Sequence, residues 1–151
     1  MLVRTPEDMR ALGASLAAEA RAGDLVVLTG PLGAGKTVLA QGIGAGLGVR
    51  ERVTSPTFVI AHVHREGRLP FVHVDAYRLS SVAEVDDLDL DASFGESVTV
   101  VEWGGGLVES LADSWLAVTI DRAADTDERT VTFEPAGGDW AARLASAGFA
   151  P

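Results

Sequence analysis

The sequence contains no cysteine among its 151 residues, which excludes disulfide bonds, thiolate zinc sites and cysteine nucleophiles. It also lacks a run of about 18 apolar residues, the length that a membrane-spanning helix needs. Its first residues do not show the basic-then-apolar pattern of a secretory signal. We therefore expect a cytoplasmic protein with no membrane partner. A chain of this length can bury a sizeable core, so we expect residues 1–151 to form a single domain.

Lysine is almost absent as well. The twelve basic residues are eleven arginines and one lysine, Lys36, and the formal net charge is −10. Affinity for nucleic acid comes mainly from clustered Lys and Arg, and no basic run is present. The composition therefore argues against a protein that binds nucleic acid by itself.

That single lysine lies in Gly30-Pro-Leu-Gly-Ala-Gly-Lys-Thr37, which matches the phosphate-binding pattern G-x-x-x-x-G-K-[ST] in full. Gly30, Gly33 and Gly35 permit backbone conformations in which successive N–H groups turn toward an anionic phosphate. Lys36 is expected to reach the β- and γ-phosphates, and the Thr37 hydroxyl to bind Mg²⁺. A compact ammonium suits such a loop better than a planar guanidinium, so the isolated lysine supports this interpretation over a chance glycine-rich turn.

The context of the loop is also as the mechanism requires, because an apolar strand pattern precedes it and a helical pattern follows it. Thr5-Pro-Glu-Asp8 is a typical helix start, with an N-cap, a first-position proline and first-turn acids. We expect an α/β fold, a three-layer P-loop NTPase sandwich with a mainly parallel central sheet and added antiparallel strands. Strands are expected over 25–29, 59–64, 71–74, 98–101, 115–120 and 130–133, and helices over about 5–22, 35–47, 82–91 and 139–147.

Acidic residues follow two of the apolar runs, Asp75 after residues 71–74 and Glu102 after residues 98–101. P-loop chemistry requires a carboxylate at the end of a neighbouring strand to position Mg²⁺. Either acid alone could be an ordinary polar residue at a strand exit, but two in one nucleotide-binding domain favour a functional role. One would hold the metal, and the other would orient or deprotonate the attacking water.

The segment Thr54-Ser-Pro-Thr-Phe58 is rich in hydroxyl groups and is stiffened by Pro56. It resembles a switch segment that senses a γ-phosphate. A capped turn that leads into a strand explains the same residues equally well. Both interpretations stay open at this point.

Three histidines lie on two of the expected strands. His62 and His64 are two residues apart and therefore share a strand face, and His73 on the facing strand could approach them. We identify no acid near them on that face. A structural role is therefore favoured over a histidine metal site.

Four segments together resemble one family, the bacterial tRNA threonylcarbamoyladenosine biosynthesis ATPases TsaE, also called YjeE. They are GPLGAGKT at Gly30–Thr37, TSPTF at Thr54–Phe58, HVDAYRL at His73–Leu79 and VEW at Val101–Trp103, within roughly residues 5–135. The resemblance implies a subunit that binds and hydrolyses ATP with TsaB and TsaD proteins. That assembly attaches a threonylcarbamoyl group to adenosine 37 of tRNAs that read codons beginning with A. The resemblance therefore implies that this chain meets tRNA only indirectly, through the complex.

The resemblance also implies roles for single residues. Thr37 and Glu102 would be Mg²⁺ ligands, while Asp75 would act in hydrolysis together with Lys36. Val38 stands where the family often has a second threonine, so only its backbone N–H can serve the α-phosphate. The residues expected to bind ATP are Gly30, Gly33, Ala34, Gly35, Lys36, Thr37, Val38, Thr57 and Trp103. The segment around Thr5 and Pro6 would contact the adenine, and a nucleotide role for Arg129 is left open.

Two other classes of P-loop protein fit less well. A small-molecule kinase with Asp75 as its base would need a lid and an arginine cluster near the motifs, and the sequence indicates neither. A GTPase switch would ordinarily carry an N-K-x-D guanine motif, which is impossible here because Lys36 is the only lysine. An ATPase is therefore the favoured function.

Overall fold

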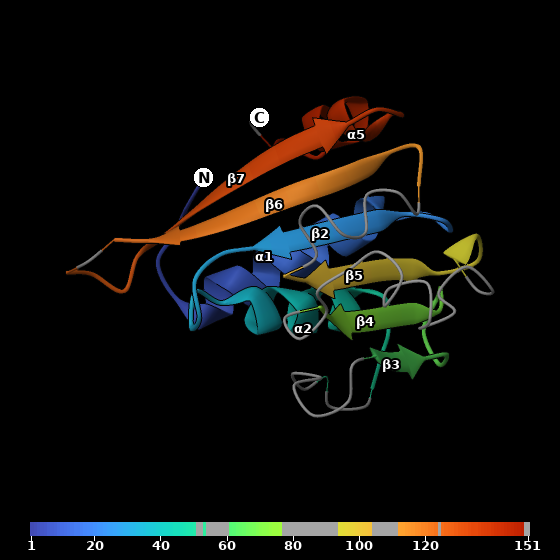
Figure 1. Cartoon of the computed structure of the whole chain (residues 1–151), viewed down its shortest axis with the longest axis horizontal. Coiled ribbons are helices and arrows are strands. Elements are labelled where there is room, and N and C mark those ends of the chain that lie inside the picture. Colours follow the sequence, from blue (N-terminus) through green and yellow to red (C-terminus); the bar gives the residue numbers. More distant parts are fainter. Residues whose placement is uncertain (51–52, 54–60, 77–93, 104–111, 124, 150–151) are drawn as a thin grey trace.

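The computed structural model describes residues 1–50, 53, 61–76, 94–103, 112–123 and 125–149. Seven strands in these ranges form one sheet in the order β1-β7-β6-β2-β5-β4-β3 (Figure 1). The four central strands β6, β2, β5 and β4 are parallel, and β1, β7 and β3 join antiparallel. This confirms the predicted fold class. The strands are β1 (Leu2–Val3), β2 (Leu25–Thr29), β3 (Ala61–His64), β4 (Phe71–Asp75), β5 (Val98–Glu102), β6 (Trp115–Arg122) and β7 (Arg129–Ala136).

The described helices are α1 (Pro6–Glu19), α2 (Lys36–Gly46) and α5 (Trp140–Ser146). Figure 1 shows α1 and α2 side by side on one face of the sheet, and α5 beside β7. The Thr5 hydroxyl accepts the Asp8 N–H at 3.0 Å, and Pro6 opens α1, as the sequence predicts. All three helices begin and end within a few residues of their expected limits.

Glycines allow α1 and α2 to pack closely. A Cβ atom added to Gly13 of α1 would lie 2.6 Å from the Leu39 carbonyl oxygen, and one added to Gly42 of α2 would overlap the Arg10 backbone. Glycine inside a helix costs about 1 kcal/mol relative to alanine. Here the cost is offset by the close packing of the two helices, which holds α2 against α1.

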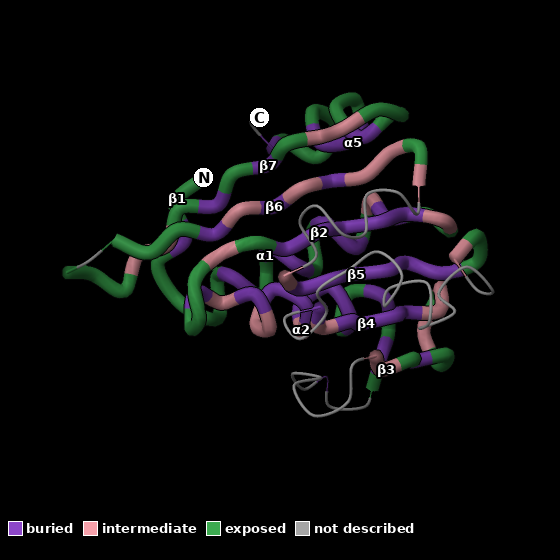
Figure 2. The backbone as a smooth tube through the Cα atoms, viewed as in Figure 1, coloured by how far each residue is buried: buried purple, intermediate pink, exposed green. Residues whose placement is uncertain are grey.

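The buried apolar residues form two clusters, one on each face of the sheet. Figure 2 shows that the central strands β2, β5 and β4 are mostly buried along their length. Successive residues of β2 belong to opposite clusters, so this parallel strand has an uninterrupted apolar sequence. The cluster beneath the helices includes Leu12, Leu39, Ile43, Phe71, Val100 and Val118. The opposite cluster consists of Leu25, Val27, Val72, Val74, Ala76 and Val101.

The structure departs from the predicted elements in detail. The two-residue strand β1 carries no periodicity and was not predicted; it is defined by pairing with β7 in the register Leu2 to Thr130. Strands β6 and β7 are longer than expected, because their pairing continues beyond the segments that we predicted. The expected hairpin between β3 and β4 is confirmed. The helix expected over 82–91 lies outside the described residues.

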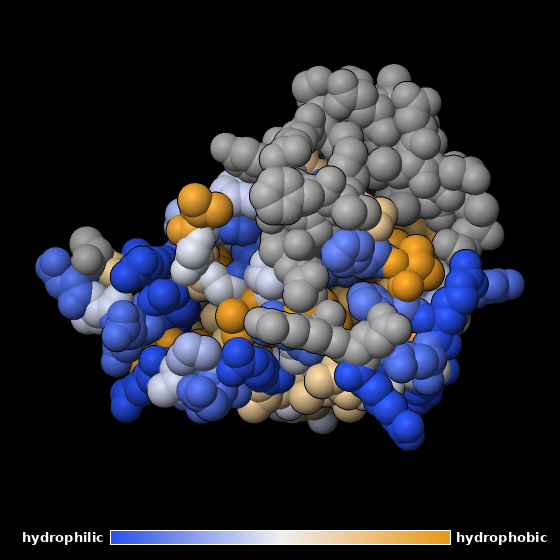
Figure 3. Space-filling view, turned by 90° about the horizontal axis from the view of Figure 1, so that it is seen from below, coloured by the Kyte–Doolittle hydropathy of each residue, from blue (hydrophilic) through white to orange (hydrophobic). Residues whose placement is uncertain are grey.

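On the face drawn in Figure 3, apolar residues occur in small groups among hydrophilic ones on the described surface. The large apolar side chains exposed in the described ranges are Met1, Leu2, Leu32 and Val63; Met1 and Leu2 are neighbours in the chain, and the other two lie in different segments. Within those ranges, none of the helices has both the length and the apolar content needed to cross a membrane.

Candidate functional site

The sheet topology places both predicted acids beside the predicted phosphate loop, residues 30–37. Asp75 and Glu102 are register partners at the ends of the parallel strands β4 and β5. Glu102 is in turn the register partner of Leu28 on β2, the strand that leads into the loop. Ligands bind at the carboxyl ends of parallel strands in open α/β sheets. The acids and the loop therefore share the edge where a nucleotide would be expected.

The loop between β2 and α2 has the conformation that its glycines permit. Gly33 has φ +77° and Gly35 has φ +111°, in the left-handed region that residues with a Cβ rarely adopt. A Cβ on Gly30 would come 2.5 Å from the Ile120 carbonyl oxygen, so the loop also packs tightly against β6. Gly35 is the N-cap of α2 and makes no side-chain capping bond, so the N–H groups of the first turn are available to an anion.

The side chain of Lys36 is buried and folds back over this loop. Its Nζ atom donates to the Gly30 carbonyl oxygen at 2.8 Å and to the Pro31 carbonyl oxygen at 2.9 Å. It also lies 3.9 Å from the centroid of the Trp103 ring, within range of a cation–π interaction. Burial lowers the pKa of Lys36, while the nearby carboxylates of Glu102 and Asp75 oppose that shift.

Trp103 directly follows β5 and has a left-handed backbone conformation. Its φ of +64° is the only positive value for a non-glycine residue in the described ranges. Its N–H donates to the Leu28 carbonyl oxygen at 3.0 Å, which ties the turn to the end of β2. A tryptophan held in this sparsely populated conformation is placed with its ring over the lysine of the loop.

Glu102 connects α2 to β4 through its two carboxylate oxygens. Thr37 Oγ1 donates to Glu102 Oε1 at 3.0 Å, and His73 Nε2 lies 2.5 Å from Glu102 Oε2. Glu102 is only 3% exposed and His73 is fully buried. Our sequence interpretation found no acid near the histidines, and the structure corrects it. The available signal was that His73 stands two residues before Asp75 and so shares its strand face.

The Thr37 hydroxyl and the Glu102 carboxylate fit a magnesium site. Mg²⁺ prefers oxygen ligands at about 2.0–2.1 Å in octahedral geometry, so neighbouring ligand oxygens stand about 2.9 Å apart. The observed separation of Thr37 Oγ1 and Glu102 Oε1 is 3.0 Å. A hydroxyl that donates its proton to a carboxylate still has lone pairs for a metal. Both the chemistry and the spacing of these two oxygens are therefore suitable.

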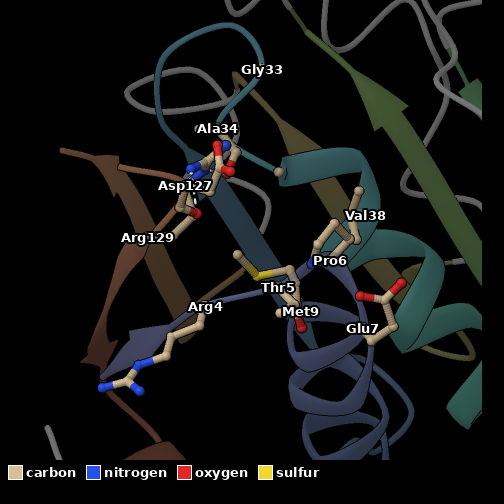
Figure 4. A pocket seen from close by; sticks show the side chains of 11 residues that line it. Arg4, Thr5, Pro6, Glu7, Met9, Gly33, Ala34, Val38, Asp127 and Arg129 are labelled. Carbon is tan, nitrogen blue, oxygen red and sulfur yellow. Dashed lines mark hydrogen bonds between the residues drawn. The ribbon is translucent and has the colours of Figure 1, made fainter. Parts of the chain in front are cut away.

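A pocket of about 500 Å³ adjoins the outer side of the loop (Figure 4). Thr5, Pro6 and Met9 line it from the start of α1, and Gly33 to Gly35 with Val38 line it from the loop and α2. Arg129 enters from β7, where its Nε donates to the Ala34 carbonyl oxygen at 3.1 Å. The segment expected near the adenine and the arginine left open from the sequence thus border one cavity beside the phosphate loop.

The structure gathers most of the predicted site residues at one edge of the sheet. Lys36, Thr37, Asp75, Glu102 and Trp103 all lie around the loop, and their roles stay predictions. Thr57, with the whole segment Thr54–Phe58, lies outside the described residues. Among the described residues, no group of three or more His, Cys, Asp or Glu side chains is arranged to hold a metal ion. His62, His64 and His73 therefore do not form such a site with one another.

Comparison with known proteins assigns the chain to a family. The family model "Threonylcarbamoyl adenosine biosynthesis protein TsaE" matches residues 3–131. This chain belongs to the TsaE family. A protein named tRNA threonylcarbamoyladenosine biosynthesis protein TsaE from Streptomyces coelicolor is 59% identical over 139 residues, covering 88% of this chain and 94% of that protein. Its namesake from Bacillus subtilis is 43% identical, covering 87% of this chain and 82% of the relative.

The solved structures agree with this assignment. The crystal structure of YdiB from Bacillus subtilis superposes with a TM-score of 0.83 and 34% sequence identity. The match covers 98% of this chain and 92% of the other. The TsaE resemblance inferred from four short segments therefore extends through nearly the whole chain and its fold.

Proposed function

We propose that this chain is a Mg²⁺-dependent ATPase subunit of the machinery that makes threonylcarbamoyladenosine in tRNA. The relatives in the TsaE family carry that pathway in their names. The observation that carries the ATPase part is the contact between Thr37 and Glu102 beside the buried ammonium of Lys36. This is the arrangement in which a P-loop protein holds a metal next to nucleotide phosphates.

The residues of the loop would bind the triphosphate of ATP. Backbone N–H groups from Gly33 to Val38 would surround the phosphates, and Lys36 would exchange its bonds to the Gly30 and Pro31 carbonyl oxygens for phosphate oxygens. Thr37 and Glu102 would hold the metal. Bound Mg²⁺ supplies positive charge that neutralises the β- and γ-phosphate oxygens. Trp103 and Thr57 would complete the nucleotide-binding surface.

Asp75 would act on the attacking water rather than on the metal. It stands in register with Glu102 on the neighbouring strand, so its carboxylate belongs to the same sheet edge, one strand farther from the loop. A carboxylate in this place can orient the water and accept its proton as the bond to the γ-phosphate forms. The products would be ADP and inorganic phosphate, with no acceptor other than water.

Within the pathway, the chain would act in the cytoplasm with TsaB and TsaD homologues. The complex would threonylcarbamoylate adenosine 37 of tRNAs that read codons beginning with A, and this subunit would support its repeated turnover. With a net charge of −10, the chain itself would meet tRNA only through the complex. We expect weak ATP hydrolysis by the isolated chain, because the partners would complete or regulate the site.

The test is co-purification with the TsaB and TsaD homologues in the presence and absence of ATP and Mg²⁺. We expect a complex that forms with ATP and is lost in the variant Lys36→Ala. ATP labelled at the γ-phosphate should yield inorganic phosphate only. Strong hydrolysis by the isolated chain without detectable binding to either homologue, or label on a small-molecule acceptor, would contradict the proposal.

A further inference from the structure

The buried contact between His73 and Glu102 has no part in the function proposed above. His73 Nε2 lies 2.5 Å from Glu102 Oε2, and both side chains are at most a few per cent exposed. A carboxylate oxygen accepts hydrogen bonds, so the ring nitrogen donates. A buried carboxylate requires such donors, because burial without them costs several kcal/mol. Glu102 obtains one from α2 through Thr37 and one from β4 through His73.

The two donors divide the carboxylate between them. His73 takes Oε2, while Thr37 Oγ1 is nearer to Oε1, at 3.0 Å, than to Oε2, at 3.3 Å. The oxygen that is left beside the Thr37 hydroxyl is therefore Oε1. We propose that His73 is a positioning residue, which holds Glu102 Oε2 so that the carboxylate presents Oε1 to Mg²⁺ beside Thr37. The inference rests on the proposed metal site.

The surroundings of His73 suit a fixed donor. Its ring stacks on Phe71 with centroids 5.9 Å apart, so the plane of the imidazole is set by an apolar neighbour. Its other nitrogen, Nδ1, is buried and has no hydrogen-bond partner among the described residues. The polar contact of the ring is therefore aimed at a single atom, Glu102 Oε2. A partner outside the metal ligands that orients a ligand in this way typically affects metal affinity.

The arrangement also separates Glu102 from a competing partner. Lys36 is close enough for the Glu102 carboxylate to oppose the lowering of its pKa by burial. A glutamate freed from His73 has rotatable side-chain bonds and can turn toward that ammonium. Such a turn would take the carboxylate away from the position beside Thr37 where it would meet the metal. The hydrogen bond from His73 on β4 opposes this rotation of the Glu102 side chain.

The experiment measures the affinity of a fluorescent ATP analogue with Mg²⁺ and with EDTA. The ratio of the two affinities is the benefit that the metal gives, and it is independent of hydrolysis. We compare the wild-type chain with His73→Leu, which removes the donor, and with His73→Gln, whose amide nitrogen is the same number of bonds from Cβ as Nε2. The matched control is His64→Leu. His64 is also buried, and its ring also stacks on Phe71, with centroids 5.8 Å apart.

We expect His73→Leu to reduce the benefit of Mg²⁺ about 10-fold or more while the affinity in EDTA stays unchanged. His73→Gln should restore most of the benefit, and His64→Leu should keep all of it. A His73→Leu variant with the wild-type benefit would overturn the inference, as would an equal loss in His73→Gln. If His73→Leu does not fold, His73→Asn takes its place, since its amide is one carbon too short to reach Glu102.

The wild-type chain separates failure of this inference from failure of the proposed function. Binding of the ATP analogue that Mg²⁺ strengthens in the wild type, with no effect at position 73, would overturn only the role of His73. No binding of the analogue by the wild type, or binding that Mg²⁺ does not strengthen, would overturn the proposed metal-dependent ATPase and the inference with it.

Discussion

Buried charged side chains lie near both ends of β2, and their hydrogen-bond partners differ. Before the strand, Asp24 accepts two hydrogen bonds from the Arg143 guanidinium, at 2.7 and 2.9 Å. Arg143 also donates to Asp139 at 3.0 Å and to the Glu19 carbonyl oxygen at 2.7 Å. After the strand, the hydrogen bonds of Lys36 go to two carbonyl oxygens of its own loop. The Arg143 guanidinium therefore forms hydrogen bonds with a carboxylate, whereas the hydrogen bonds of Lys36 go only to backbone carbonyl oxygens.

The difference agrees with the proposed function, in which only the carboxyl end of β2 binds a ligand. A bidentate guanidinium–carboxylate pair satisfies both charges. It also joins α5 to the segment before β2, although the two are far apart in the sequence. It leaves neither charge for an outside ligand. Carbonyl dipoles stabilise an ammonium less than an anion does, so Lys36 can leave them for a phosphate. We therefore assign stability to the amino end of β2 and binding to its carboxyl end, and four variants test that assignment.

The largest effect is expected at the amino end. Arg143→Ala leaves Asp24 buried without its partner, and the free energy of unfolding should fall by about 3–5 kcal/mol in urea denaturation. The exposed pair of Arg21 and Asp139 supplies the control, since Arg21→Ala should cost about 1 kcal/mol or less. A loss of similar size in both variants would remove the distinction between buried and exposed pairs.

Lys36→Ala should show the opposite pattern. Loss of the ammonium should weaken ATP binding about 100- to 1000-fold, or about 3–4 kcal/mol, in a calorimetric titration. Its cost in unfolding free energy should be smaller than that of Arg143→Ala, because the buried cation has no carboxylate among its hydrogen-bond partners. Folded Arg143→Ala protein with equally poor ATP binding would show that the two ends are not separate.

Asp75→Ala tests the division of labour within the binding end. We expect ATP affinity near that of the wild type and turnover lower by about 100-fold, or about 2.7 kcal/mol in the barrier. Phosphate release measures turnover, and calorimetry measures affinity for Mg²⁺ and ATP together. Glu102→Ala is the comparison, and it should lose that affinity instead. Equal losses of affinity in the two variants would mean that Asp75 also holds the metal.

The smallest effect is expected for Thr5→Ala at the start of α1. Removal of the hydroxyl that caps the Asp8 N–H should cost about 1 kcal/mol of unfolding free energy. Thr5→Ser keeps the capping oxygen and should lie near the wild type in the same denaturation experiment. An effect of several kcal/mol would place a major source of stability at the binding end and so contradict our assignment.

Much of the binding end could be predicted from local patterns. The pattern from Gly30 to Thr37 predicts a phosphate loop, and apolar runs that end in Asp75 and Glu102 predict acids at strand ends. Each signal lies within a few consecutive residues. The Arg143–Asp24 pair could not be predicted, because 119 positions separate the partners and neither residue stands in a recognisable motif. The strand β1 could not be predicted for a similar reason, since its two residues form a strand only by pairing with β7.

The sequence by itself determined the α/β fold class, the glycine-rich loop with the chain's only lysine and the membership of the TsaE family, because short-range patterns encode all three. Only the tertiary structure decided which side chains meet. The strand order puts β4 beside β5, and this register brings His73 to Glu102, while the placement of α2 brings Thr37 to the same carboxylate. Contacts of this kind depend on how distant strands pair and which faces they turn to α2, and no local pattern carries that information.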